Sequence, residues 1–219
     1  GQQMVGIEAL LRWHHPTRGL IAPGEFIAIA EETGLIIPIG DWVLRTACRE
    51  AARWPSGLSV AVNLSPVQFR GGRLVETVEA ALAACGLAAG RLELEITEGV
   101  LMVDNEATLG TLRRLRELGV RIVMDDFGTG YSSLSYLRAF PFDKVKIDRS
   151  FVRELASDRD SASIVRAIVA LGRSLGIATT AEGVETPEQI RQIHAEGCTQ
   201  VQGFIISRPV PADEVLSLV

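Results

Sequence analysis

The repeating unit of the fold is clearest in residues 106–126, which read EATLGTLRRLRELGVRIVMDD. Leucines at positions 109, 112, 115 and 118 recur at the spacing of one face of an α-helix, and Gly119 is the residue type that ends such a helix. Residues 120–124 are mostly apolar, which is typical of a buried strand. Asp125 and Asp126 follow that strand directly. A helix, a glycine, a strand and a polar residue therefore stand in this order.

The same order recurs on both sides of this stretch. Helices are predicted over 44–54, 74–85, 163–175 and 188–196, in addition to the one over 106–118. Strands are predicted near 4–10, 59–63, 92–96, 121–125, 144–147, 178–181 and 199–201. Strands that alternate with helices predict an α/β fold with a parallel sheet. Seven strands in a chain of 219 residues predict a TIM-like (β/α)8 barrel that is one strand short. An open doubly wound sheet is the alternative.

Each predicted strand ends in a polar residue, and this feature favours the barrel. The strand ends are Glu8, Asn63, Glu95, Asp125, Lys146, Glu182 and Gln202. In a barrel the carboxyl ends of the strands converge on one face, where the chemistry takes place. Carboxylates crowded on one face repel one another unless cations neutralise them. Oxygen ligands without a Cys or His cluster suit Mg²⁺ or Mn²⁺, and adjacent aspartates can share two metals.

The composition narrows the class of protein. The formal net charge of the 219 residues is -5, which disfavours a nucleic-acid polymer as a partner. A small anionic ligand is compatible with this charge if a metal ion inverts the local field. The cysteines Cys48, Cys85 and Cys198 are odd in number and scattered, which favours a reduced compartment and hence a cytoplasmic domain. No apolar run is long enough to span a bilayer. The sequence is compatible with a membrane anchor elsewhere in a full-length protein.

Ordered motifs surround the polar residues at the strand ends. They are Glu8-Ala9-Leu10-Leu11-Arg12-Trp13, Asn63-Leu64-Ser65, Glu95-Ile96-Thr97-Glu98, Asp125-Asp126-Phe127-Gly128-Thr129-Gly130-Tyr131-Ser132-Ser133, Lys146-Ile147-Asp148, Ala181-Glu182-Gly183-Val184-Glu185 and Gln202-Gly203. In this order they resemble the motifs of the EAL family of cyclic di-GMP phosphodiesterases. The resemblance covers nearly the whole chain, and the ordered set is more specific than any one match.

The resemblance implies a centre of two divalent metals, Mg²⁺ or Mn²⁺. The implied ligands of the first metal are Glu8, Asn63, Glu95 and Asp125. Asp125 would bridge to a second metal, which Asp126 would also hold. Gly128 and Gly130 permit a tight loop beside the metals, since glycine adopts backbone conformations that other residues avoid.

The resemblance also assigns catalytic and substrate-binding roles. Lys146 would orient or polarise the attacking water, and among carboxylates it stays protonated, which favours an electrostatic role. Glu182 resembles the general base or second-site ligand, Glu185 would support it, and Glu98 would hold the loop after Asp126. Arg12 would pair with a substrate phosphate, for which a guanidinium is suited. Leu11 and Gln202 complete the predicted substrate contacts.

The implied reaction is metal-dependent hydrolysis of cyclic di-GMP to linear pGpG. A receptor that binds cyclic di-GMP without cutting it is the main alternative. Receptors in this family usually lack some motif residues, and none is missing here, which favours the enzyme. Another metal-dependent barrel enzyme, such as a lyase acting on a carboxylate substrate, is a third reading.

The resemblance also predicts how the chain is organised. We expect residues 1–219 to form one domain, excised from a longer protein with an upstream sensor or GGDEF-type domain. Family members carry one more strand and helix before the Glu8 strand. We therefore expect an upstream, antiparallel strand to close the barrel, because an open sheet edge leaves unpaired backbone groups. A homodimer through the loop after Asp126 is a further expectation. Ile206 departs from the aromatic that the family usually shows there.

Overall fold

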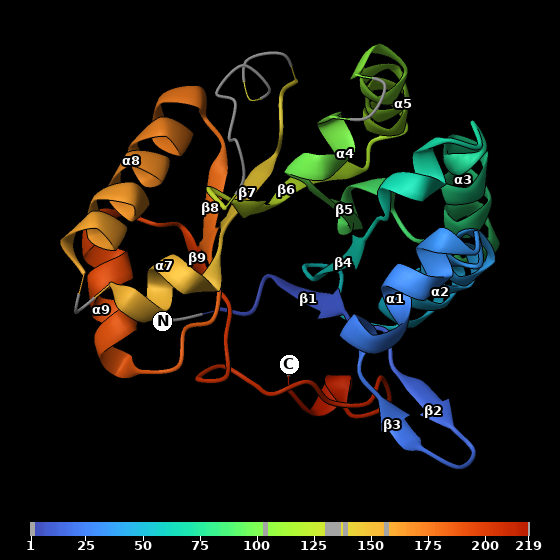
Figure 1. Cartoon of the computed structure of the whole chain (residues 1–219), viewed down its shortest axis with the longest axis horizontal. Coiled ribbons are helices and arrows are strands. Elements are labelled where there is room, and N and C mark those ends of the chain that lie inside the picture. Colours follow the sequence, from blue (N-terminus) through green and yellow to red (C-terminus); the bar gives the residue numbers. More distant parts are fainter. Residues whose placement is uncertain (1–2, 103–104, 130–136, 138–139, 156–157, 219) are drawn as a thin grey trace. The chain divides into compact units, whose positions relative to one another are not determined.

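The computed structural model describes residues 3–102, 105–129, 137, 140–155 and 158–218 (Figure 1). The chain forms two compact units, Gly1–Arg121 with Leu216–Val219 and Ile122–Val215. Each unit has its own parallel strands and its own helices. Within the described residues, no helix has both the length and the apolar character needed to cross a membrane.

The first unit contains a parallel sheet with a buried, apolar middle strand. Its strands are β1 (Gly6–Ala9), β4 (Ser59–Asn63) and β5 (Leu92–Thr97), in the order β1-β4-β5. Val60 and Leu94 are fully buried in this sheet. Near-continuous apolar runs of this kind are typical of parallel strands that are covered on both faces.

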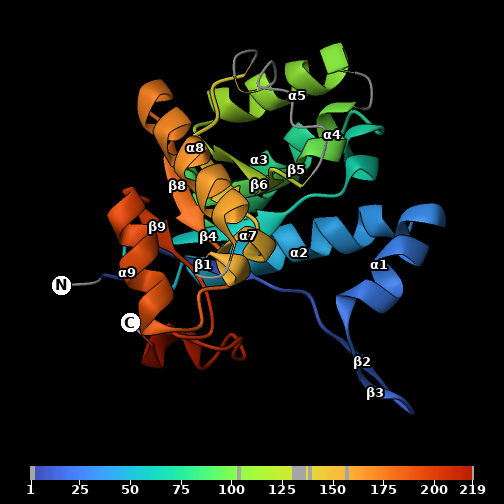
Figure 2. The same ribbon diagram turned by 60° about the vertical axis from the view of Figure 1, so that its left-hand side comes forward.

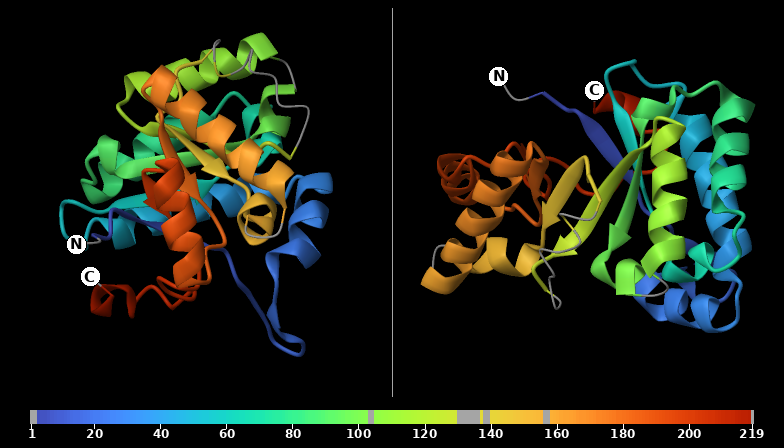
Figure 3. Two further views of the ribbon diagram at one scale, coloured as in Figure 1. Left: turned by 90° about the vertical axis from the view of Figure 1, so that its left-hand side faces the viewer. Right: turned by 90° about the horizontal axis from the view of Figure 1, so that it is seen from above.

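Helices cover this sheet. They are α1 (Pro23–Glu32), α2 (Ile36–Ala51), α3 (Leu74–Cys85), α4 (Glu98–Met102) and α5 (Asn105–Glu117), with 3₁₀ turns at Pro66–Phe69 and Ala89–Arg91. Helices α2 and α3 pack side by side, and α2 also contacts β4 (Figures 1 and 3). Arg91 ties the end of α2 to the start of β4, because its guanidinium donates to the carbonyl oxygens of Ala51 and Leu58, at 2.7 Å each.

A short antiparallel hairpin projects from this unit before α1 (Figure 2). Its strands are β2 (Trp13–His15) and β3 (Gly19–Ile21). The indole of Trp13 packs edge to face on Phe26 of α1, with the ring centroids 5.5 Å apart. The sequence indicates only the turn at Pro16, because strands of three residues are too short to show a period.

Among its described residues, the second unit contains four parallel strands and three helices. The strands are β6 (Arg121–Phe127), β7 (Lys144–Ile147), β8 (Ala178–Ala181) and β9 (Gln200–Val201), in the order β6-β7-β8-β9. The helices are α7 (Arg149–Glu154), α8 (Arg159–Leu175) and α9 (Pro187–Glu196). A 3₁₀ turn at Val215–Ser217 begins at the last residue of this unit and continues into the residues assigned to the first unit. Val165 and Val169 form part of the apolar face of α8, which packs on β7 and β8. Helices α8 and α9 lie beside each other (Figure 1).

The predicted alternation of helices and parallel strands is confirmed in the described residues. All seven predicted strands are present, and each overlaps its predicted range. The predicted helix over 74–85 matches α3, whereas α2 and α8 begin at Ile36 and Arg159, earlier than predicted. Helices α1, α4 and α7 were not predicted. Two of these three are shorter than seven residues, so their sequences span too few turns to show a helical period.

Candidate metal and phosphodiester site

In the first unit, three polar residues lie at the carboxyl ends of neighbouring strands. The amide Nδ2 of Asn63 donates to Oε1 of Glu8 at 2.7 Å. Asn63 and Glu95 are partners in the β4–β5 register, and Glu95 is 3% exposed. We call Glu8, Asn63 and Glu95 the first cluster. Its members carry carboxylate and amide oxygens, which are ligand types that Mg²⁺ and Mn²⁺ accept.

The chain turns sharply after Asn63, and this turn is held by side chains. We call residues 64–69 the β4 turn. Ser65 caps the 3₁₀ segment: its hydroxyl accepts from the N–H of Val67 at 3.2 Å, and the side-chain Oε1 of Gln68 accepts from the N–H of Ser65 at 3.0 Å. The same hydroxyl donates to Oε1 of Glu31 on α1 at 2.6 Å. The turn is therefore linked to a helix far away in the sequence.

The other predicted residues of this unit follow the strands on loops or at a helix start. Arg12 and Leu11 lie in the segment between β1 and β2, both partly buried, and Nη1 of Arg12 donates to the carbonyl oxygen of Leu11 at 2.8 Å. Glu98 is the first residue of α4, directly after β5. The roles proposed for these three residues stay predictions.

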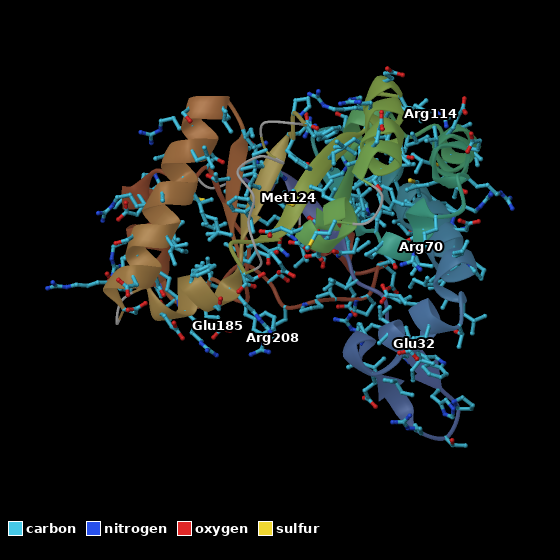
Figure 4. The ribbon with its side chains drawn as sticks, turned by 45° about the horizontal axis from the view of Figure 1, so that its top comes forward. Glu32, Arg70, Arg114, Met124, Glu185 and Arg208 are labelled. Atoms are coloured by element: carbon cyan, nitrogen blue, oxygen red, sulfur yellow. The ribbon has the colours of Figure 1, made fainter. Side chains whose placement is uncertain are left out.

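The second unit contains a buried cation between two carboxylates. Lys146 on β7 is 2% exposed. Its Nζ lies 2.7 Å from Oε1 of Glu182, which follows β8, and 3.1 Å from Oδ1 of Asp125 on β6. Met124, labelled in Figure 4, is the buried residue that immediately precedes Asp125. We call Asp125, Asp126, Lys146 and Glu182 the second cluster.

This cluster has the features of a metal site. One carboxylate oxygen each of Asp125, Asp126 and Glu182 lies within 4.8 Å of the others. Oδ1 of Asp125 is buried, and among the described residues it has no hydrogen-bond partner, since the 3.1 Å approach of Lys146 satisfies the ion-pair distance but not hydrogen-bond geometry. A buried carboxylate oxygen without a hydrogen bond is costly. A divalent cation is a partner that would satisfy this oxygen, so these residues fit the predicted metal.

The backbone and charge of Asp126 are both unusual. Its φ is 50°, a left-handed conformation that residues other than glycine rarely adopt. Burial, followed by the nearby charges of Asp125 and Asp148, raises the pKa of Asp126 to about 6. Strained backbone at such a position is a cost that functional sites often carry.

Asp148, which the sequence analysis placed in a motif without a role, is tied to Asp126. Burial opposes ionisation of Asp148, but hydrogen bonds from Ser150 outweigh it and lower the pKa of Asp148. Its carboxylate caps α7 by accepting from the N–H of Ser150 at 2.9 Å. A side-chain hydrogen bond also joins Asp148 and Asp126. The Lys146-x-Asp148 spacing therefore places a cation near the end of β7 and a helix-capping carboxylate directly after that strand.

The segments that carry Glu182 and Gln202 approach each other closely. The N–H of Gln202 donates to the carbonyl oxygen of Ala181 at 2.8 Å, and Val184 donates in turn to the carbonyl oxygen of Gln202 at 3.0 Å. A Cβ added to Gly203 would meet the backbone of Val184, so only glycine fits there without displacement. The backbone contact explains in physical terms why glycine follows Gln202.

Glu185 contacts Gln189, the third residue of α9. It is exposed on the loop after β8 (Figure 4), and its N–H donates to Oε1 of Gln189 at 2.8 Å. Gln189 also accepts from the N–H of Thr186 at 3.0 Å and donates to the carbonyl oxygen of Val152 on α7 at 3.3 Å. Gln189 therefore links this loop to α7. The Thr186-to-Gln189 spacing is a capping-box signal that the sequence analysis did not use.

Two predictions concern residues outside the described part of the chain. The predicted loop glycine Gly130 lies there, and so does most of the loop through which dimerisation was predicted.

The chain belongs to the EAL domain family, because the family model of the EAL domain matches residues 1–209. It is 50% identical over 220 residues to the bifunctional diguanylate cyclase/cyclic di-GMP phosphodiesterase MucR of Pseudomonas aeruginosa, covering 99% of this chain and 32% of MucR. It is 46% identical over 209 residues to the cyclic di-GMP phosphodiesterase NbdA of the same organism, covering 94% of this chain and 27% of NbdA.

A solved structure shows the same fold. The structure of the PaMucR phosphodiesterase in complex with c-di-GMP matches with a TM-score of 0.94 and 50% identity, covering 98% of this chain and 88% of that chain. The predicted TIM-like class of parallel strands and helices is thereby confirmed, with seven parallel strands in the described residues. The chain spans only about a quarter to a third of the length of the curated relatives it matches.

Proposed function

We propose that this chain hydrolyses cyclic di-GMP to linear pGpG and depends on Mg²⁺ or Mn²⁺ to do so. The observation that carries the proposal is the second cluster, in which a buried lysine lies between two carboxylates and one carboxylate oxygen has no hydrogen bond from any described residue. Membership of the EAL family supports it, as do the phosphodiesterase names of MucR and NbdA.

The metal ligands we propose come from both clusters. Glu8, Asn63, Glu95 and Asp125 would hold the first metal, and Asp125 and Asp126 the second. When bound, the metals would supply a water of lowered pKa and would neutralise the charge that develops on the phosphate. The hydrogen bond from Asn63 to Glu8 holds these two proposed ligands next to each other. Because the Nδ2 of Asn63 faces Glu8, the amide oxygen of Asn63 faces another direction.

Lys146 supplies fixed positive charge. Its ammonium is held by Glu182 and Asp125, so its position costs little to organise at the moment of reaction. We propose that it donates a hydrogen bond that orients the attacking water. Glu182 would accept the proton that this water loses, and Glu185 would support the loop that carries Glu182.

The remaining residues are proposed to bind the substrate or to order the site. Arg12 would pair with a phosphate of cyclic di-GMP, because a guanidinium matches the phosphate oxygens. Leu11 and Gln202 would contact the substrate beside it, and Glu98 would hold the loop that follows Asp126. The exposed Ile206 would replace an aromatic wall of the guanine pocket.

One assay separates this proposal from its alternatives. The chain is incubated with cyclic di-GMP and Mg²⁺ or Mn²⁺, and the products are resolved by chromatography. Formation of pGpG that stops on addition of EDTA is expected. Binding of cyclic di-GMP without pGpG would identify a receptor, and neither binding nor turnover would favour another metal-dependent barrel enzyme.

We propose that residues 1–219 act as one domain within a longer protein. The greater length of the curated relatives and the bifunctional name of MucR support an additional GGDEF-type or sensor domain upstream. The homodimer, the closing upstream strand and the cytoplasmic location stay predictions.

A further inference from the structure

We propose that Glu31 is a positioning residue for Asn63 and acts through Ser65. The inference rests on the proposed function, because it takes Asn63 as a metal ligand. Glu31 lies on α1, in none of the motifs at the strand ends, and its side chain reaches the β4 turn that directly follows Asn63.

The contact between Glu31 and Ser65 is short and involves a charged acceptor. The hydroxyl of Ser65 donates to Oε1 of Glu31 at 2.6 Å, within the range of a charge-assisted O–H···O⁻ bond. The bond joins residues 34 positions apart. Because such bonds are stronger than those between neutral groups, α1 holds the turn firmly at this point.

The hydroxyl of Ser65 makes two hydrogen bonds, one as an acceptor and one as a donor. As an acceptor it caps the 3₁₀ segment through the N–H of Val67, and Gln68 completes the capping box. As a donor it binds Glu31. The cap needs only the oxygen lone pair and Gln68, so loss of the Glu31 carboxylate would leave the cap in place. The bond to Glu31 therefore fixes where the turn lies, whereas the cap fixes its local shape.

The position of the turn decides the position of Asn63. Only Leu64 separates Asn63 from Ser65, and Leu64 is buried, with its N–H bonded to the carbonyl oxygen of Glu95 at 2.9 Å. The side chain of Asn63 is exposed, so packing does little to orient it. Its direction depends on the backbone on either side and on the 2.7 Å bond to Glu8. A shift of Ser65 would move this exposed amide relative to Glu8.

Helix α2 supports the same turn from another direction. Gln68 is 7% exposed, and a Cβ added to Gly40 of α2 would collide with its side-chain amide. The turn is thus fixed on α2 by close packing and on α1 by the Glu31 bond. Glu31 is the part of this support that can be removed without creating a steric clash.

The test compares Glu31→Ala, Glu31→Gln and a matched control, Glu32→Ala. Glu32 is the next residue of α1 and is exposed (Figure 4), and in the part of the chain that the structure describes its side chain makes no hydrogen bond or ion pair. Both alanine variants remove one acidic charge from the last turn of α1, so they change the helix dipole interaction alike. Asn63→Ala serves as the reference for loss of the ligand itself.

The first measurement is Mn²⁺ affinity by titration calorimetry without nucleotide, with the melting temperature of each variant as a check of folding. We expect about tenfold weaker Mn²⁺ binding for Glu31→Ala, at the low end of the effect of residues that orient metal ligands. Glu31→Gln keeps an acceptor oxygen and should recover most of the affinity, and Glu32→Ala should match the parent. A purely structural role would lower the melting temperature without this pattern.

The second measurement is the rate of cyclic di-GMP hydrolysis as a function of Mn²⁺ concentration. Glu31→Ala should need about tenfold more Mn²⁺ for half-maximal activity and should reach the parental kcat at saturation. The inference is overturned if Glu31→Ala binds Mn²⁺ like the parent while Asn63→Ala does not, or if Glu32→Ala is equally impaired. Such a result leaves the proposed function standing. A parent protein that binds no Mn²⁺ overturns the proposed function, and the inference with it.

Discussion

Nζ of Lys146 lies 2.7 Å from Oε1 of Glu182, and only 2% of the lysine is exposed. A buried ion pair of this kind is weak evidence for stability, because the cost of removing both charges from water offsets their attraction. Its presence between residues at the ends of two neighbouring strands is easier to explain by chemistry. The predictions below test that explanation and the roles of the residues around it.

Lys146→Ala should lower kcat by at least tenfold while changing the affinity for cyclic di-GMP little. The ammonium would act on the attacking water and not on the bound substrate, so its loss affects the transition state more than the ground state. Steady-state rates give kcat, and calorimetry of cyclic di-GMP binding in EDTA, where the proposed metal-dependent turnover is stopped, gives affinity. A variant that binds poorly but turns over normally would show that Lys146 is a substrate clamp.

Glu8→Gln should reduce turnover by about 100-fold or more at saturating Mg²⁺, because a neutral amide is a poor replacement for a carboxylate ligand. The glutamine can still accept the hydrogen bond from Nδ2 of Asn63, so the fold should be unchanged. Initial rates and the far-ultraviolet circular dichroism spectrum check both statements. Equal activity of variant and parent would remove Glu8 from the set of metal ligands.

Without metal, Asp126→Asn should gain stability relative to the parent as the pH rises from about 4 to above 6. The pKa of Asp126 is raised to about 6 in the folded chain, whereas an unfolded aspartate loses its proton near about pH 4. The folded parent binds the extra proton in this window, so its stability falls as the pH rises. Asparagine has no such proton to lose.

Melting temperatures of the two proteins in EDTA, measured from pH 4 to pH 8 in about half-unit steps, give the comparison. The difference between them should grow up to about pH 6 and then stay constant. A difference that does not change with pH would mean that Asp126 titrates in the folded chain as it does in the unfolded one.

Gln189→Leu should destabilise the protein by about 2 kcal/mol, and Gln189→Glu by about half of that. Leucine loses the three hydrogen bonds that the side chain of Gln189 makes, including the two that Glu185 and Thr186 donate to Oε1. Glutamate keeps acceptor oxygens for these two N–H groups and loses only the donor to Val152. Urea unfolding of the three proteins measures the differences, and equal losses in the two variants would contradict the division of roles.

Much of the fold could be predicted because its signals are local. Apolar runs such as residues 120–124 indicated strands, and a glycine marked the end of a helix at positions 86, 119, 176 and 197. Each of these four glycines has a positive φ in the structure, as a helix C-terminus requires. The hairpin of β2 and β3 escaped prediction because each strand has three residues, and its stability comes from Trp13 packing on a helix that follows it.

The candidate site could be predicted as a set of residues but not as a set of contacts. Their place at the strand ends followed from the pattern of the chain. That Lys146 lies between Asp125 and Glu182, and that Glu31 reaches Ser65, depends on which side chains face each other across elements far apart in the sequence. No local period carries this information.

By itself, the sequence determined the alternation of strands and helices, the identity of the polar residues at the strand ends and the EAL family, because periodicity and ordered motifs are properties of the chain. Only the tertiary structure decided the left-handed backbone of Asp126 and the hydrogen bond between Ser65 of the β4 turn and Glu31 of α1. It also decided that Oδ1 of Asp125 is buried without a hydrogen bond from any described residue. The physical reason is that burial and strand register set the distances between charges, and both arise only when segments separated by tens of residues pack together.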